Sequence, residues 1–194
     1  MKLHYKGKFD GCVESLPSGE HRPGAVQFKE PESVKKLAWI ATGISLALYA
    51  VLLPVLILRG GLSLAFSIGV LLSLLTLFPH ELLHGICFKE DVYLYTNLKQ
   101  GMLFVVGPED MSRKRFVFMS LLPNFIFGVI PFMLFLVFPQ LKILGALGAF
   151  TIPMGAGDYL NVYNAMTQMP KGARTYLHGF HSYWYMPETM KNQD

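Results

Sequence analysis

Four long apolar stretches constrain the fold of this chain more than any other feature of its sequence. They cover residues 37–58, 62–88, 116–138 and 141–169. Each is long enough to cross the hydrocarbon core of a bilayer, which requires about 20 helical residues. Hydrophobic residues make up 52% of the chain and charged residues 15%, a balance that argues against a soluble protein. The sequence therefore predicts an all-α membrane protein with four transmembrane helices.

Composition also excludes several other classes of protein. The formal net charge is only +4 and the chain has two cysteines, which argues against a nucleic-acid-binding protein and against a disulfide-held scaffold. The expected partners are the lipid bilayer and a membrane protein or peptide that serves as substrate. The oligomeric state is left open by the sequence.

Short turns and positive charges predict how the spans are arranged. The turns Arg59–Gly61 and Pro139–Gln140 join the spans in pairs, as in antiparallel helical hairpins. Lysine and arginine are concentrated in residues 1–36, 89–115 and 170–194. Because positive charge is retained in the cytoplasm during insertion, we expect both termini and the middle loop to be cytoplasmic. The catalytic core would then comprise residues 37–169, with a cap before it and a tail after it.

Two segments outside the spans have patterns typical of strands. The cap, residues 1–36, could hold one hairpin. The middle loop has the runs Val92–Tyr95 and Met102–Val106 on either side of turn-forming Asn97 and Gly101, which predicts a small β-hairpin at the cytoplasmic face. This hairpin could hold an extended substrate by strand addition, or it could merely cover the helix ends.

Acidic residues inside the spans carry the functional signal. There are two, Glu81 and Asp158, and a buried charge requires a partner or a role. Glu81 lies in His80-Glu81-Leu82-Leu83-His84, which matches the HExxH pattern of metalloproteases. Residues four apart on a helix differ by about 40° in angle and about 6 Å in rise, so His80 and His84 can bind one ion. Glu81 would then lie beside the metal as a general base. The alternative is a structural pair of histidines, with Glu81 bound to a lysine such as Lys89.

A catalytic zinc usually has a third protein ligand and an open position for water. Asp158 is the best candidate, because the second and fourth spans both end in the cytoplasm. The nearby glycines, Gly155 and Gly157, would let helices approach closely. Asn124, which follows Pro123 in the third span, could donate to an oxyanion or a substrate carbonyl, or could simply bond a neighbouring helix. The sequence thus predicts one zinc ion per chain.

Three other side chains are candidate ligands. Cys87 lies three residues after His84, although a reduced packing cysteine is the simpler interpretation. His178 and His181 have a spacing typical of ligands but lie among tyrosines and tryptophan, as in an interfacial aromatic belt. These three remain open as metal contacts.

At these motifs the sequence resembles the site-2 protease family of intramembrane zinc proteases. The resemblance rests on the HExxH pattern in one span, Pro123-Asn124 in the next and Asp158 in the following one. The four-span layout and the pattern Gly157-Asp158-Tyr159-Leu160-Asn161 resemble more closely the bacterial "putative zincin" membrane peptidases. The resemblance implies that His80, His84 and Asp158 are ligands and Glu81 is the base. It also implies a multi-pass protein of a bacterial plasma membrane. Site-2 proteases carry a glycine after this aspartate, whereas Tyr159 follows Asp158 here.

The leading hypothesis is a zinc-dependent endopeptidase that cleaves membrane-associated substrates within or beside the membrane. The alternative is a non-catalytic membrane protein of the immunity or adaptor type, derived from a peptidase, that binds metal or a partner in the same pocket. A zinc transporter is a third hypothesis, disfavoured because a glutamate beside two histidine ligands suits activation of water.

Overall fold

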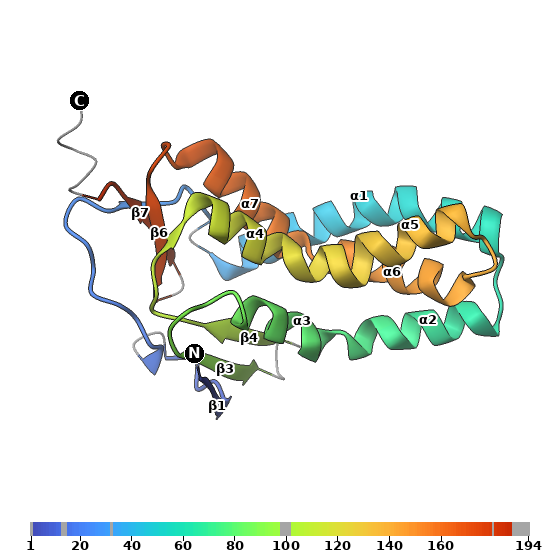
Figure 1. Ribbon diagram of the computed structural model, residues 1–194, viewed down its shortest axis with the longest axis horizontal. Helices are drawn as coiled ribbons and strands as arrows, with labels where there is room; N and C mark the ends of the chain where they lie inside the picture. The colour runs from blue at the N-terminus through green and yellow to red at the C-terminus, as the bar shows by residue number, and fades with distance from the viewer. Residues whose placement is uncertain (1, 13–14, 32, 98–101, 180, 188–194) are drawn as a thin grey trace. The chain divides into compact units, whose positions relative to one another are not determined.

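The computed structural model describes residues 2–12, 15–31, 33–97, 102–179 and 181–187. The chain forms two compact units, which we call the sheet unit and the helical unit and describe separately (Figure 1). The sheet unit comprises Met1–Glu30, Glu81–Met119 and Asn161–Asp194. The helical unit comprises Pro31–His80 and Ser120–Leu160.

The helical unit consists of apolar helices joined by short turns. Its elements are α1 (Val34–Gly60), α2 (Leu64–Leu75), the π-helical turn η3 (Phe125–Val129), α5 (Ile130–Val137), α6 (Lys142–Met154) and parts of α3 (Leu77–Gly85), α4 (Arg113–Asn124) and α7 (Ala156–Gln168). Gly61 follows α1 with φ of 67°, a conformation that glycine adopts without strain. Ser63 then caps α2 by accepting a hydrogen bond from the backbone N–H of Phe66 at 3.4 Å. Of the first predicted turn, Arg59 and Gly60 belong to the last turn of α1 and only Gly61 lies in the connection. The second, Pro139–Gln140, forms a turn between α5 and α6.

The core of the helical unit is built around α6, which packs against α1, α2, η3 and α5. Its buried residues are Leu56, Phe132, Phe135, Ala146 and Ala149. Small residues on α6 let these helices approach closely. A Cβ atom on Gly148 would lie 2.5 Å from the carbonyl oxygen of Gly128 and 2.6 Å from the backbone nitrogen of Phe132. Glycine at position 148 is therefore required by the packing.

Replacing Gly148 with alanine is expected to destabilise the helical unit. The added methyl group meets backbone rather than a flexible side chain, so the free energy of unfolding should fall by about 1–3 kcal/mol. Gly43→Ala in α1 is the matched control, because nothing lies within 4 Å of its Cβ position. Thermal unfolding in detergent micelles should show a lower midpoint for Gly148→Ala alone. Equal midpoints for the two variants would contradict the packing of α6.

Several helices are long and apolar enough to cross a membrane. Lys35–Gly60 and Arg113–Val137 qualify individually. The pairs α2–α3 and α6–α7 qualify only as pairs, which bend by 42° and 53°. By length and composition there are two candidate spans, or up to four if each bent pair is one span. On α1, Leu46, Val51 and Leu58 are 62%, 65% and 86% exposed, which favours contact with lipid.

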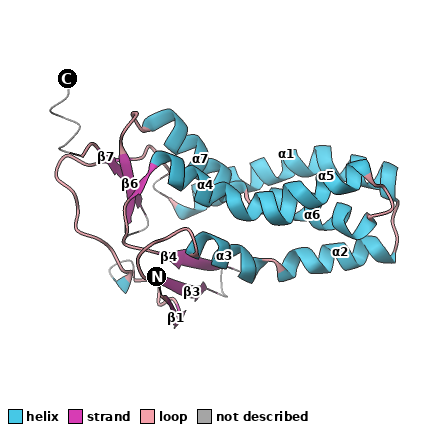
Figure 2. Ribbon diagram, in the orientation of Figure 1, coloured by secondary structure: helices cyan, strands magenta, loops and turns pink. Residues whose placement is uncertain are grey.

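The sheet unit contains the β-structure of the described residues, seven strands in two sheets (Figure 2). One sheet has the order β1-β3-β4, from Leu3–Lys8, Val92–Asn97 and Met102–Val106. The other has the order β2-β7-β6-β5, from Val26–Gln27, His181–Tyr185, Arg174–His178 and Met111–Ser112. The first sheet buries Phe9, Leu16, Tyr95 and Val106.

The expected all-α class is wrong, because the chain mixes helices with these two sheets. The predicted antiparallel pairing of β3 with β4 is confirmed, while the turn between them lies outside the described residues. Over the described residues of the cap, the two strands do not pair with each other. Instead β1 pairs parallel to β3, and β2 pairs with β7. The tail interpreted as an aromatic belt forms the antiparallel strands β6 and β7, since tyrosine and tryptophan are favoured in strands as well as at membrane interfaces.

Candidate metal centre

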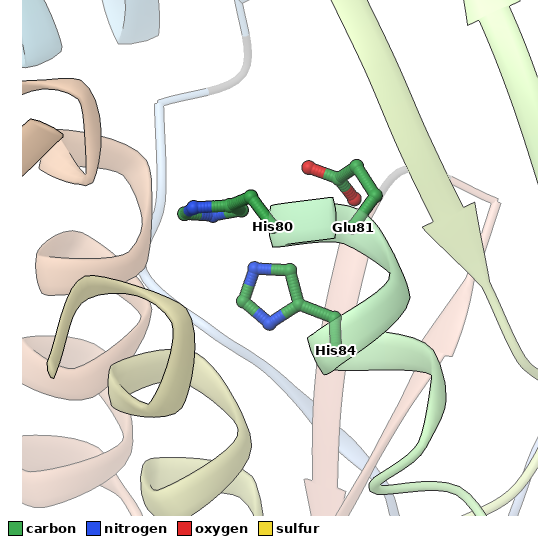
Figure 3. A group of neighbouring side chains, drawn as sticks. All are labelled: His80, Glu81 and His84. Carbon is green, nitrogen blue, oxygen red and sulfur yellow. The ribbon is translucent and has the colours of Figure 1, made fainter. Parts of the chain in front are cut away.

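The HExxH sequence lies on α3, a short helix that starts directly after the bend at the end of α2. The backbone N–H of His80 donates to the carbonyl oxygen of Thr76 at 2.8 Å. Figure 3 shows the imidazole rings of His80 and His84 on one side of the helix and the Glu81 carboxylate apart from them. One ligand atom from each of the three side chains lies within 4.8 Å of the others, and all three residues are half-buried. The helix therefore presents two imidazoles together, with a carboxylate beside them.

His84 has a tautomer that suits metal binding. Its Nδ1 lies 3.0 Å from the carbonyl oxygen of Met119. A carbonyl oxygen only accepts hydrogen bonds, so Nδ1 carries the hydrogen and Nε2 of the neutral ring has the lone pair. A histidine ligand typically has its second ring nitrogen fixed in this way.

Glu81 is held by the neighbouring sheet. Its Oε2 accepts a hydrogen bond from the backbone N–H of Val105 at 3.2 Å. Val105 lies in β4, and within the described residues β4 pairs with β3 alone. This bond fixes the orientation of the carboxylate against the unpaired edge of the sheet.

Asp158 lies in the first turn of α7 and contacts His80. Its Oδ2 is 3.2 Å from His80 Nε2, and each side chain is 14% exposed. Two donor atoms on one tetrahedral zinc, each about 2.0–2.1 Å from the ion, lie roughly 3.3 Å apart. The distance therefore fits two ligands of one ion and equally fits a hydrogen-bonded pair.

Asn124 supports Asp158 from α4. Its Nδ2 donates to Asp158 Oδ2 at 2.7 Å, and the residue is 2% exposed. A Cβ atom on Gly155 would lie 1.9 Å from Asn124 Oδ1, so only glycine leaves room for this amide. The close approach expected of the glycines near Asp158 is seen at Gly155, while nothing lies within 4 Å of the Cβ position of Gly157.

Comparison with models of known protein families finds a match that covers the residues of the candidate site. The model of the family described as "Putative zincin peptidase" matches residues 73–174, more than half of the chain. The chain belongs to this family. The zincin match includes the HExxH helix, Asn124 and Asp158. No curated protein and no solved structure matches the chain.

The other candidate ligands of this zincin family member have different contacts. Cys87 Sγ donates to the carbonyl oxygen of Leu83 at 3.4 Å. His178 Nδ1 lies 3.4 Å from the carbonyl oxygen of Gly19. His181 Nδ1 lies 3.4 Å from Glu30 Oε1. Over the described part of the chain, the one group of three or more side chains close enough to hold a metal is His80, Glu81 and His84, which includes none of these three. Asp158 is also outside this group and reaches it through its contact with His80.

Some groups at this candidate site carry no recognisable sequence signal. The carbonyl of Met119 and the N–H of Val105 are backbone groups, which every residue except proline supplies alike. Arg115 and Glu109, which bond the segment after α3, could have been suspected only as a charged pair near the end of a helix. Tertiary contacts alone reveal their partners.

Proposed function

We propose that this chain is a zinc-dependent peptidase that hydrolyses peptide bonds of membrane-associated substrates, within or beside the membrane. The observation that carries the proposal is that His80 lies close to both of the other proposed ligands. His80 shares one side of α3 with His84, and its Nε2 lies 3.2 Å from Asp158 Oδ2. The zincin family match supports the same function, and so does the resemblance of these motifs to those of site-2 proteases.

His80, His84 and Asp158 would hold one zinc ion. Two neutral imidazoles and one carboxylate form a donor set typical of catalytic zinc, which keeps a position open for water. The hydrogen bond of His84 Nδ1 to Met119 favours the tautomer that can bind metal through Nε2. The amide of Asn124 orients the carboxylate of Asp158. The donor chemistry and these contacts therefore fit zinc.

Each residue has a role in hydrolysis. When bound, zinc supplies Lewis acidity that activates water and polarises a substrate carbonyl. Glu81 accepts the proton of the attacking water and passes it to the leaving amine. The N–H of Val105 keeps the Glu81 carboxylate aligned for both transfers. Asn124 commits one amide hydrogen to Asp158, and its second is the proposed donor to the oxyanion or substrate carbonyl.

The free edge of β4 within the described residues is the proposed binding surface for an extended substrate. A peptide bond within a helix is shielded by its own hydrogen bonds, so a membrane segment must be extended before it is cleaved. Amide groups alternate in direction along a strand, so the Val105 N–H bonded to Glu81 marks the edge that faces away from β3. An extended substrate paired along this edge would pass beside the proposed base.

The proposed location is the plasma membrane of a bacterium, with four spans and both termini cytoplasmic. The apolar helices provide two to four candidate spans. The concentration of lysine and arginine in residues 1–36, 89–115 and 170–194 favours this orientation.

Removal of zinc tests the proposal directly. Purified protein in detergent, assayed with a library of quenched fluorescent peptides, should lose hydrolysis when treated with a chelator. Activity should return when about one equivalent of zinc per chain is added, because the metal supplies the activation of water. Magnesium, which prefers oxygen ligands, is the control and should not restore activity. Hydrolysis that persists after complete zinc removal would refute the proposed mechanism.

A further inference from the structure

A charged pair links the end of α3 to the segment after β4. Arg115, in the first turn of α4, donates through Nε and Nη2 to the carbonyl oxygen of Cys87, at 2.8 and 2.6 Å. Its Nη1 pairs with Glu109 Oε1. Glu109 Oε2 in turn accepts the backbone N–H groups of Lys89 and Glu90, at 2.6 and 3.0 Å. One guanidinium and one carboxylate therefore hold three backbone groups of the turn that follows α3. We call Arg115 and Glu109 the clasp.

The clasp is largely buried. The side chains of Arg115 and Glu109 are 22% and 7% exposed. Burial opposes ionisation of Glu109, yet the hydrogen bonds from Arg115 and from the amides of Glu90 and Lys89 outweigh it and hold the pKa of this carboxyl below its usual value. The pair is thus charged at neutral pH, and hydrogen bonds between charged groups are about twice as strong as neutral ones.

The clasp completes a closed set of contacts that includes Glu81. We call this set the ring of contacts around Glu81. Cys87 lies in the turn that ends α3, where its backbone N–H donates to the carbonyl oxygen of His84. Glu109 comes shortly after β4, the strand whose Val105 N–H donates to Glu81. Between them, the ring of Phe88 packs so closely on Gly107 that a Cβ there would lie 2.4 Å from it. A shift of β4 along α3 would break the bond between Val105 and Glu81.

We propose that Arg115 and Glu109 are positioning residues, which set the orientation of Glu81 by fixing β4 against the end of α3. This inference rests on the proposed peptidase function. It predicts that the clasp affects turnover more than substrate affinity, because Glu81 acts in proton transfer. A displacement of about 1 Å in a catalytic group can cost up to about 100-fold in rate.

The neighbouring carboxylate provides a matched control. Asp110 Oδ1 pairs with Arg174 at 2.7 Å and its Oδ2 accepts from the hydroxyl of Tyr185, which ties it to β6 and β7 instead of α3. Glu109→Gln and Asp110→Asn each remove one charge from a carboxylate paired with an arginine. Only the first change affects the ring of contacts around Glu81.

The experiment compares these variants in the full-length protein. Glu109→Gln should lower kcat by about 10- to 100-fold with KM and bound zinc unchanged, since alignment of the base is lost. Hydrogen exchange in β4 should become faster. Asp110→Asn should lower the unfolding midpoint without changing kcat or β4 exchange. Arg115→Lys keeps the charge but not the forked geometry, so its kcat should fall between those of wild type and Glu109→Gln.

The possible outcomes distinguish failure of the positioning role from failure of the proposed peptidase function. If Glu109→Gln keeps wild-type kcat and β4 exchange, or if Asp110→Asn lowers kcat equally, the positioning role is refuted while the peptidase function stands. If Glu81→Gln retains full hydrolysis, the proposed function has failed. The exchange measurement then still decides whether the clasp fixes β4.

Discussion

Glu81→Gln is expected to abolish peptide hydrolysis while leaving about one zinc per chain in place. The amide oxygen of glutamine can still accept the hydrogen bond from Val105, so the local fold should be kept. The amide cannot take a proton from water, and loss of a general base typically costs about 10²- to 10⁴-fold in rate. Turnover of a fluorescent peptide and metal analysis of the same preparation measure both effects.

The control for this change is Glu90→Gln, a glutamate beyond the end of α3. It removes the same charge without touching the HExxH helix, and its hydrolysis should match that of wild type. If Glu81→Gln keeps its activity in vitro, or keeps a cellular phenotype that depends on the protein, a non-catalytic role in binding metal or a partner replaces the peptidase hypothesis.

Removing any one proposed ligand should abolish stoichiometric zinc binding. The variants are His80→Ala, His84→Ala and Asp158→Ala, each of which leaves two of three protein donors. Asn124→Ala removes only the hydrogen bond to Asp158, and loss of such a bond typically weakens metal affinity by about 10- to 100-fold. Zinc titration of each purified variant should therefore show a graded series.

Cys87→Ser is the control for this series, because a bound thiolate would make this residue a ligand as well. It should keep full zinc content. Size-exclusion chromatography in detergent establishes that each variant is folded before its metal is measured. Full zinc retention in Asp158→Ala would remove this carboxylate from the ligand set and with it the proposed geometry. Zinc loss in Cys87→Ser would add a ligand that the contacts do not suggest.

Local patterns predicted those elements whose partners are close in sequence. The spacing of His80 and His84 predicted a shared helix face, and α3 has it. The alternating runs on either side of the middle turn predicted the pairing of β3 with β4. Both depend on periodicity and short-range turns, which are properties of the local sequence.

Local patterns did not predict pairing between strands that are distant in the sequence. β1 pairs in parallel with β3, and β2 with only two residues pairs with β7 near the end of the chain. Nothing in a short strand specifies which distant strand it will meet. The tyrosines and tryptophan of β7 also fit an interfacial belt, so composition could not distinguish the two structures. The all-α interpretation was wrong for this reason.

By itself, the sequence determined that the chain has apolar helices and that one of them presents two histidines and a glutamate, because these features follow from helical periodicity and the cost of burying charge. Only the tertiary structure decided that Asp158 contacts His80, that Asn124 holds Asp158, and that Val105 and the clasp hold Glu81. These contacts join residues distant in the chain, often through backbone groups that every sequence shares. Such contacts exist only once the elements have packed.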